Sequence, residues 1–140
     1  MTMKFDRSLL PAAFATLLFA ACSSAPPYAA LSIDEDAEAE SNVTVTDSEL
    51  LDVIRVGKNP LVERVPGSNQ LKIAVTLRNI DDEPIQILAQ TSFLNAQKQP
   101  LGDDTNKQVK LLAPGETITH VAISKSSDAR DWQLRLSWNR

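Results

Sequence analysis

The sequence has very few of the residues that build covalent or metal-linked cores. Its 140 residues include one cysteine, one histidine and four glycines. A single cysteine cannot form a disulfide within its own chain, and a structural zinc site made of cysteines and histidines lacks ligands, so both are excluded. The four glycines are scattered singly, which excludes a glycine-rich phosphate loop. The length suits one small domain with some additional chain.

Basic residues are absent from one long stretch. Between residues 8 and 54 there are eight Asp and Glu residues and no Lys or Arg. Residues 55–140 contain twelve Lys and Arg against nine Asp and Glu, so this part of the chain is mildly basic. So small an excess, spread over so many residues, forms no basic stripe, and we expect no nucleic-acid partner.

The first 21 residues have the layout of a secretory signal peptide. Lys4 and Arg7 give a basic start, and an uncharged apolar run of about a dozen residues follows. This run is shorter than the roughly 20 residues that span a membrane. It also contains Pro11, which weakens a spanning helix. We therefore expect residues 1–21 to be removed on export.

Small residues stand immediately before the single cysteine. The segment Leu18-Phe19-Ala20-Ala21-Cys22 resembles the lipobox of bacterial lipoproteins. The resemblance implies that the Cys22 thiol receives a diacylglyceryl group, that the leader is cut before Cys22, and that the new amino terminus is acylated. One acyl chain binds a membrane only marginally, whereas two or more anchor a protein stably. We expect a protein that is anchored to the membrane through lipid on Cys22 and does not span it.

The residue after the cysteine bears on the location of the protein. Ser23 stands there rather than Asp, which in enterobacteria-like systems resembles the default for export to the outer membrane. We therefore expect a cell-envelope protein that faces the periplasm. The alternative for Cys22 is a buried free thiol in an ordinary apolar helix.

Residues 22–42 combine two adjacent prolines, small residues and a block of acids. Such a composition buries too little apolar surface to offset the entropy of ordering, so we expect a disordered acidic tether extended by charge repulsion. The alternative for the acids is a calcium site, but the glycine turn and fixed spacing of an EF-hand loop are missing. We expect no metal and no cofactor.

From residue 43 onward the hydrophobic period is two, which is typical of strands with one buried face. The expected strands are residues 43–46, 53–56, 71–79, 84–94, 109–112, 117–124 and 132–138. Asp47 or Ser48 can cap one helical turn between the first two strands. About seven short strands without a long helix predict an all-β, antiparallel immunoglobulin-like β-sandwich over residues 43–140.

Three segments occur in the order found in one known family. They are residues 71–79 (LKIAVTLRN), residues 85–101 (IQILAQTSFLNAQKQPL), and residues 111–117 (LLAPGET) followed by a short Ser-Asp-Ala. Together with the lipobox they resemble the YcfL-like lipoproteins. The resemblance implies a small periplasm-facing protein with an immunoglobulin-like sandwich and no assigned activity. The chain departs from the family at one place: where the family has an aromatic-rich Trp-Tyr-Asp and then a glycine, this chain has Phe93-Leu94-Asn95 and then Lys98. Phe93 is the aromatic residue that this segment keeps, and it is the candidate binding surface.

Few residues suggest catalysis. His120 is the only histidine and lies in an expected strand, without a nucleophile elbow or a comparable signature of a Ser-His-Asp triad. Adjacent carboxylates at residues 81–83 and 103–104 lie in expected turns, whereas glycosidase carboxylates converge from separate elements. We therefore expect no enzyme, and a cell-wall hydrolase that uses His120 is the alternative.

The two tryptophans allow two interpretations. Trp132 and Trp138 lie six residues apart on one face of the last expected strand, where they form part of the core or a stacking platform for sugar or peptide. The function that we expect is a protein-interaction or accessory module in the envelope, which pairs with an envelope protein through an exposed strand edge. The alternative is a glycan- or peptidoglycan-binding module that uses Phe93 or an exposed tryptophan.

Overall fold

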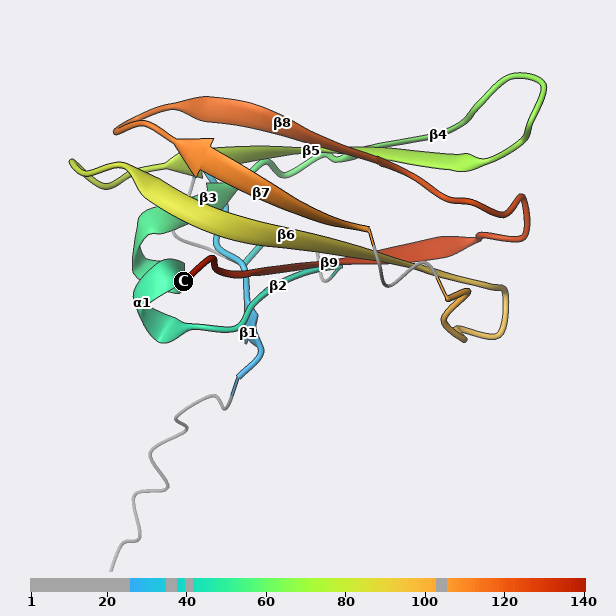
Figure 1. Ribbon diagram of the computed structural model, residues 1–140, viewed down its shortest axis with the longest axis horizontal. Coiled ribbons are helices and arrows are strands. Elements are labelled where there is room, and N and C mark those ends of the chain that lie inside the picture. Colours follow the sequence, from blue (N-terminus) through green and yellow to red (C-terminus); the bar gives the residue numbers. More distant parts are fainter. Residues whose placement is uncertain (1–25, 35–37, 40–41, 103–105) are drawn as a thin grey trace, which may run out of the picture.

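The computed structural model describes residues 26–34, 38–39, 42–102 and 106–140, which form two β-sheets lying one above the other (Figure 1). The elements in chain order are β1 (Tyr28–Ala29), β2 (Val43–Val45), α1 (Ser48–Val53), β3 (Ile54–Val56), β4 (Leu61–Arg64), β5 (Leu71–Asn79), β6 (Ile85–Leu94), β7 (Lys107–Leu112), β8 (Thr117–Ile123) and β9 (Asp131–Trp138). The predicted all-β sandwich is confirmed. The described chain has nine strands in place of about seven.

The larger sheet has five strands in the order β1-β2-β9-β6-β7. Its pairings are antiparallel except for that of β2 with β9, which is parallel. Alternate residues of β6 from Ile85 to Phe93 are buried, and so are alternate residues of β9 from Trp132 to Leu136. Each of these strands therefore turns one side toward the core, as its period of two predicts.

β5 is the central strand of the smaller sheet. β8 pairs with most of its length, whereas β3 and β4 pair with two separate parts of it. Because a strand has only two edges, β3 and β4 lie end to end along the edge that β8 leaves free. The link between them passes close to β5, since a Cβ atom on Gly57 would lie 3.0 Å from the Cβ atom of Thr76. Gly57 is therefore suited to this crossing.

Every strand expected from the hydrophobic period is present, within two residues at each end. The expected helical turn is α1, although the Asp47 side chain makes no capping hydrogen bond. Two strands were not expected, namely β1 and β4. In β4 the side chains of Leu61, Val62 and Glu63 are all exposed, so no alternation of burial marks that strand.

The first described residues belong to the sandwich. β1 pairs with β2, and the following Ala30 is buried. The chain then reaches the smaller sheet, where the Leu31 carbonyl accepts a hydrogen bond from the Val56 N–H at 2.8 Å. The prediction that residues 22–42 form a disordered tether is therefore wrong for this stretch, and the domain begins near Tyr28. The reason is tertiary, because the edges of β2 and β3 need partners for their backbone groups and this segment supplies them.

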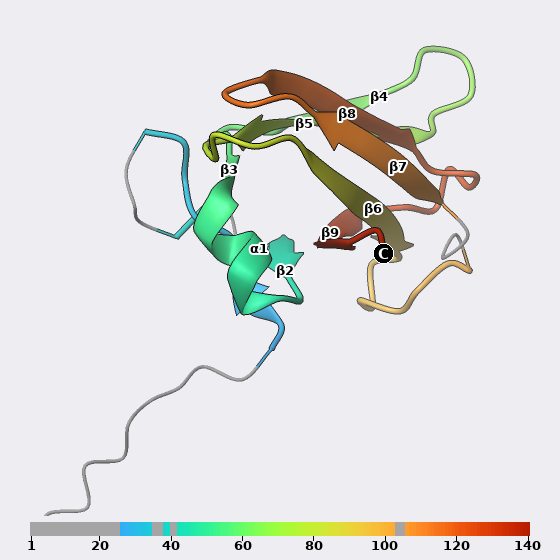
Figure 2. The ribbon, with the colours of Figure 1, turned by 60° about the vertical axis from the view of Figure 1, so that its left-hand side comes forward.

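The core between the sheets consists mainly of aliphatic side chains. α1 lies beside the sandwich near β2 and β3 (Figure 2), and its Leu50 is fully buried. Two polar residues from opposite sheets, His120 and Thr91, are also fully buried in this core. The burial of His120 bears on the predicted alternative of a hydrolase that uses this histidine.

Candidate functional site

His120 lies in the core and not at the surface. Its Nε2 atom is 2.9 Å from Oγ1 of Thr91 on the facing sheet, and its Nδ1 atom has no hydrogen-bond partner among the described residues. Burial, with a smaller contribution from the charge of Lys110, lowers the pKa of His120 to about 4. A general base needs access to its substrate, which a fully buried imidazole does not have. The hydrolase alternative therefore gains no support from His120.

The aromatic side chains also point inward. Phe93 is 0% exposed and Trp132 is 4% exposed, so neither offers a surface to a ligand. Phe93 as a candidate binding surface is therefore wrong, because the alternation of β6 directs this residue into the core. Trp138 is half-buried against the core, and the guanidinium of Arg140 lies 5.3 Å from its ring centroid. The burial of the two tryptophans therefore fits the interpretation as core residues better than that as a stacking platform for sugar or peptide.

Asp131 is held by several donors at the start of β9. Its carboxylate accepts hydrogen bonds from Asn42 Nδ2 at 3.0 Å and from the Trp132 N–H at 2.9 Å, and it pairs with Lys98. Desolvation raises the pKa of Asp131, but the bonds from Lys98, Trp132 and Asn42 together outweigh it and hold the pKa below its usual value. This network joins the entry to β2, the chain after β6 and the start of β9.

The adjacent carboxylates behave as turn residues where they are described. In the turn between β5 and β6, Asp81 Oδ1 accepts the N–H of Asp82 at 2.8 Å. Residues 103–104 lie outside the described residues. Across the described ranges, no group of three or more His, Cys, Asp or Glu side chains is placed to hold a metal ion.

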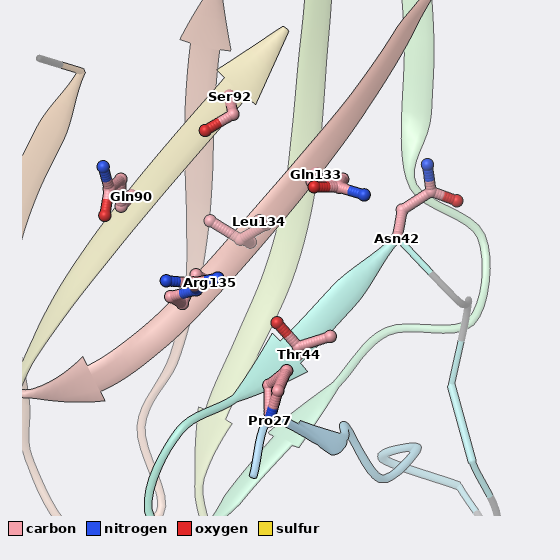
Figure 3. Close-up of a pocket in the computed structure, with 8 residues that line it drawn as sticks. All are labelled: Pro27, Asn42, Thr44, Gln90, Ser92, Gln133, Leu134 and Arg135. Atoms are coloured by element: carbon pink, nitrogen blue, oxygen red, sulfur yellow. The ribbon is translucent and has the colours of Figure 1, made fainter. Parts of the chain in front are cut away.

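A polar groove of about 490 Å³ lies on the outer face of the larger sheet (Figure 3). Its lining residues come from β2, β6, β9 and the chain before β1 and β2. They are Pro27, Asn42, Thr44, Gln90, Ser92, Gln133, Leu134 and Arg135. The strand register places Thr44, Arg135 and Gln90 in one row across β2, β9 and β6. Among the described residues of the groove, amide and hydroxyl groups therefore surround one cation, Arg135.

Arg135 is the charged residue of this groove. Its side chain is exposed, and no hydrogen bond or ion pair joins that side chain to another described residue. Asp131 also points outward from β9, but Lys98 already pairs with it. Lys107 ends the row of Arg135 and Gln90 on β7. This row therefore holds two basic residues, Arg135 and Lys107.

β7 borders the same outer face and forms one end of the larger sheet. Its Val109 and Leu111 side chains are 54% and 69% exposed. The Thr91 N–H donates to the Asn106 carbonyl at 3.2 Å, so these two residues form a hydrogen-bonded pair of the antiparallel ladder between β6 and β7. Hydrogen-bonded and non-hydrogen-bonded pairs alternate along such a ladder. By that alternation the N–H of Val109 points away from β6. Pairing through a strand edge stays a prediction, and β7 is the edge that fits it best.

An apolar patch lies on the outer face of the smaller sheet. It consists of Leu61, Ala74 and Val121, which stand side by side across β4, β5 and β8, and of Ile123, which is diagonal to Ala74. Leu61, Val121 and Ile123 are 51%, 39% and 44% exposed. Scattered exposed apolar residues are common, but contiguous ones mark surfaces that bind another molecule.

Neither the groove nor the apolar patch was predicted. Five of the residues that line the groove, namely Thr44, Gln90, Ser92, Gln133 and Arg135, occupy the outward positions of predicted strands, and this polar character was visible in residues 132–138. The missing information was which strands lie side by side, because a row such as Thr44, Arg135 and Gln90 joins three distant segments of the chain.

The predicted anchor lies outside the described residues. This applies to the signal peptide at residues 1–21, to Leu18, Phe19, Ala20 and Ala21 of the lipobox, and to Cys22. Among the helices of the described ranges, none is long and apolar enough to cross a bilayer.

These features define a small β-sandwich domain with buried aromatic residues and two distinct outer faces. No protein-family model matches the sequence, and no curated protein matches it. Two solved structures are similar. One is Cj0090 of Campylobacter jejuni, with a TM-score of 0.57 and 15% identity, where the match covers 71% of this chain and 100% of that one.

The other is a DUF1425 family member from Shewanella sp. pv-4. Its TM-score is 0.53 at 12% identity, and the match covers 59% of this chain and 75% of that one. At such identities the likeness shows a shared fold alone. The DUF1425 family has the fold that the resemblance to YcfL-like lipoproteins implied, so that expectation is confirmed for the fold. Membership of this chain in the family stays a prediction.

Proposed function

We propose that the protein is a lipid-anchored, non-catalytic interaction module of the bacterial cell envelope. In this proposal Cys22 carries the lipid and holds the protein on the periplasmic side of the outer membrane. The sandwich presents the apolar patch to another envelope protein. The leader and the lipobox support the anchor, and the shared fold of the two similar structures is compatible with an accessory domain.

The apolar patch is the observation that carries the interaction. Leu61 on β4 and Val121 and Ile123 on β8 remain 51%, 39% and 44% exposed on the two sides of β5, and a partner that covered them would gain the free energy of their burial. Beside them, Lys72 and Glu63 form an ion pair at 3.3 Å in the next row of the sheet. An apolar centre with a polar border is the usual arrangement of a protein interface.

The buried residues weaken both the hydrolase alternative and the glycan-binding alternative. His120 is paired with Thr91 in the core, and Phe93 and Trp132 are inaccessible. Glycan-binding sites usually stack sugars on exposed aromatic rings. The described residues that line the groove include no aromatic side chain, so the glycan-binding alternative has less support than a protein partner.

The start of the sandwich limits the distance between the domain and the anchor. Because β1 begins at Tyr28, five residues separate it from Cys22. Even fully extended, that stretch of chain reaches about 20 Å. The expected tether to residue 42 would have reached about 65 Å. The proposed module therefore stays close to the membrane surface.

The anchor is tested by replacing Cys22 with Ser in the full-length chain. We expect loss of palmitate labelling and release of the protein from the membrane fraction. Ser23→Ala is the matched control, since it changes the adjacent residue and keeps the thiol. Palmitate labelling that survives Cys22→Ser would contradict the anchor.

The interaction surface is tested by photocrosslinking in the intact envelope. A photoreactive residue at Val121 should yield a discrete crosslinked product with one envelope protein, whereas the same residue at Gln133 on the opposite face should not. Val121→Asp should abolish capture of that partner without unfolding the protein, because Val121 is already exposed. Identical products from both positions, or none from Val121, would argue against the proposal.

A further inference from the structure

We infer that the outer face of the larger sheet lies against the membrane and that the groove around Arg135 binds the phosphate of an anionic lipid. This inference rests on the lipid anchor proposed above and assigns an orientation to the anchored domain. The apolar patch on the other sheet would then face the periplasm, where its partner can reach it.

The position of the groove relative to the anchor is the first argument. Pro27 lines the groove and comes only five residues after Cys22. Five residues span about 17 Å at most. An anchored chain therefore holds the groove close to the lipid headgroups. A short tether of this kind raises the effective concentration of the surface into the millimolar range, so a weak contact suffices.

The charge of the groove is the second argument. The Arg135 side chain has no partner among the described residues, and the described residues that line the groove include no carboxylate. A guanidinium matches the geometry of phosphate oxygens and forms paired, charge-assisted hydrogen bonds with them. Gln133 and Thr44 lie beside Arg135 and add an amide and a hydroxyl donor.

The apolar residues on the same face are the third argument. The row of Arg135 and Lys107 is followed by a row with Leu88 and Val109, and then by a row with Leu111. Val109 and Leu111 are more exposed than the large apolar residues of the opposite sheet. Cations beside exposed apolar side chains are typical of surfaces that lie in the lipid interface.

Two acidic residues near β2, Asp47 and Glu49, already have hydrogen-bond or ion-pair partners. Asp47 accepts hydrogen bonds from Thr46 Oγ1 at 3.1 Å and from the Trp138 N–H at 3.4 Å. Glu49 pairs with Arg140 at 3.3 Å. These two carboxylates lie at α1 and its start, and neither belongs to the described residues that line the groove.

The test uses the mature chain, residues 22–140, coupled through its single cysteine to a maleimide lipid in nanodiscs. The discs contain phosphatidylcholine with or without phosphatidylglycerol, and a trace of lipid that carries a gadolinium chelate. Paramagnetic relaxation of backbone amides then reports which face lies near the lipid. We expect strong relaxation at Gln133 and Arg135 in discs with phosphatidylglycerol, and weak relaxation at Thr76 on the opposite face.

Arg135→Gln should lower the population of this orientation about fivefold, since one basic residue near an anionic surface contributes about 1 kcal/mol. Arg78→Gln is the matched control, because Arg78 is an exposed arginine on the outer face of the smaller sheet. It removes the same charge and should leave the relaxation pattern unchanged.

Equal relaxation on the two faces, or a pattern that does not change with Arg135→Gln, would overturn the inference. Titration of the uncoupled chain with inorganic phosphate and with an end-blocked glutamate peptide is the second arm. If either shifts the groove amides while phosphatidylglycerol does not, the groove binds a soluble anion or a protein and the inference is wrong. Because the coupling is chemical, these results do not depend on cellular lipidation, which the palmitate experiment tests separately.

Discussion

His120 on β8 and Thr91 on β6 join the two sheets through a hydrogen bond of 2.9 Å between Nε2 and Oγ1. Both side chains are fully buried. A buried polar pair costs little when its members satisfy each other, but it becomes costly when one of them acquires a charge. The pair therefore makes the stability of the sandwich depend on the protonation of one histidine.

The stability of the protein should fall in mild acid. The pKa of His120 is lowered from 6.5 to about 4 in the folded state, so between these values the unfolded chain binds more protons. The free energy of unfolding should therefore have its full value above about pH 6.5. It should fall by up to about 3 kcal/mol as the pH decreases toward 4. Urea unfolding at a series of pH values measures this slope.

The matched variant is His120→Gln, which stays neutral throughout this range. It should be less stable at neutral pH, yet its stability should change much less between pH 6.5 and 4. Lys110→Gln removes the smaller contribution and should raise the pKa of His120 slightly. A variant without the histidine that kept the full acid slope would show that other groups are responsible.

Asn79 should be among the most sensitive polar positions. Its Nδ2 atom donates to the carbonyls of Glu83 at 2.8 Å and of Leu112 and Ala113 at 3.2 Å, so it joins β5 to the end of β7. Asn79→Ala leaves these carbonyls without that donor, and we expect a loss of about 2 to 4 kcal/mol. Thermal or denaturant unfolding measures it. Asn139→Ala is the control and should change stability by about 0.5 kcal/mol or less.

Phe93 should matter for stability and not for binding at the surface. Phe93→Ala removes a fully buried ring and should cost about 3 to 5 kcal/mol. Leu111→Ala removes a side chain that is 69% exposed, so its cost should be about 0.5 kcal/mol or less. Denaturation midpoints of the two variants measure the difference. Similar midpoints would contradict the burial of Phe93.

Proline substitutions test the free edge of β7. The N–H of Val109 points away from β6, so Val109→Pro removes no ladder hydrogen bond and should cost little. Lys110 faces Ile87 in a hydrogen-bonded pair, so Lys110→Pro should cost about 3 kcal/mol. If β7 pairs with a partner strand, Val109→Pro should also prevent crosslinking to that partner. Retention of the crosslink in a folded Val109→Pro variant would exclude pairing through this edge.

The local pattern of the sequence predicted most of the strands, because alternation is a property of a few consecutive residues. Leu71 to Leu77 alternate with polar or small residues, and the structure buries that alternate set in β5. β4 and β1 were missed because neither shows such an alternation. Their strand conformation comes from pairing with β5 and β2, which lie elsewhere in the chain.

The sequence alone therefore determined the all-β class, the set of core residues in the longer strands, and the prediction of a lipid anchor at Cys22. Only the tertiary structure decided that Phe93 points inward, that His120 bonds to Thr91, and that the domain begins near Tyr28. It also decided that Arg135 stands in a groove built from three distant strands. The physical reason is that periodicity is local, whereas the order of strands in a sheet depends on contacts between residues that are far apart in the chain.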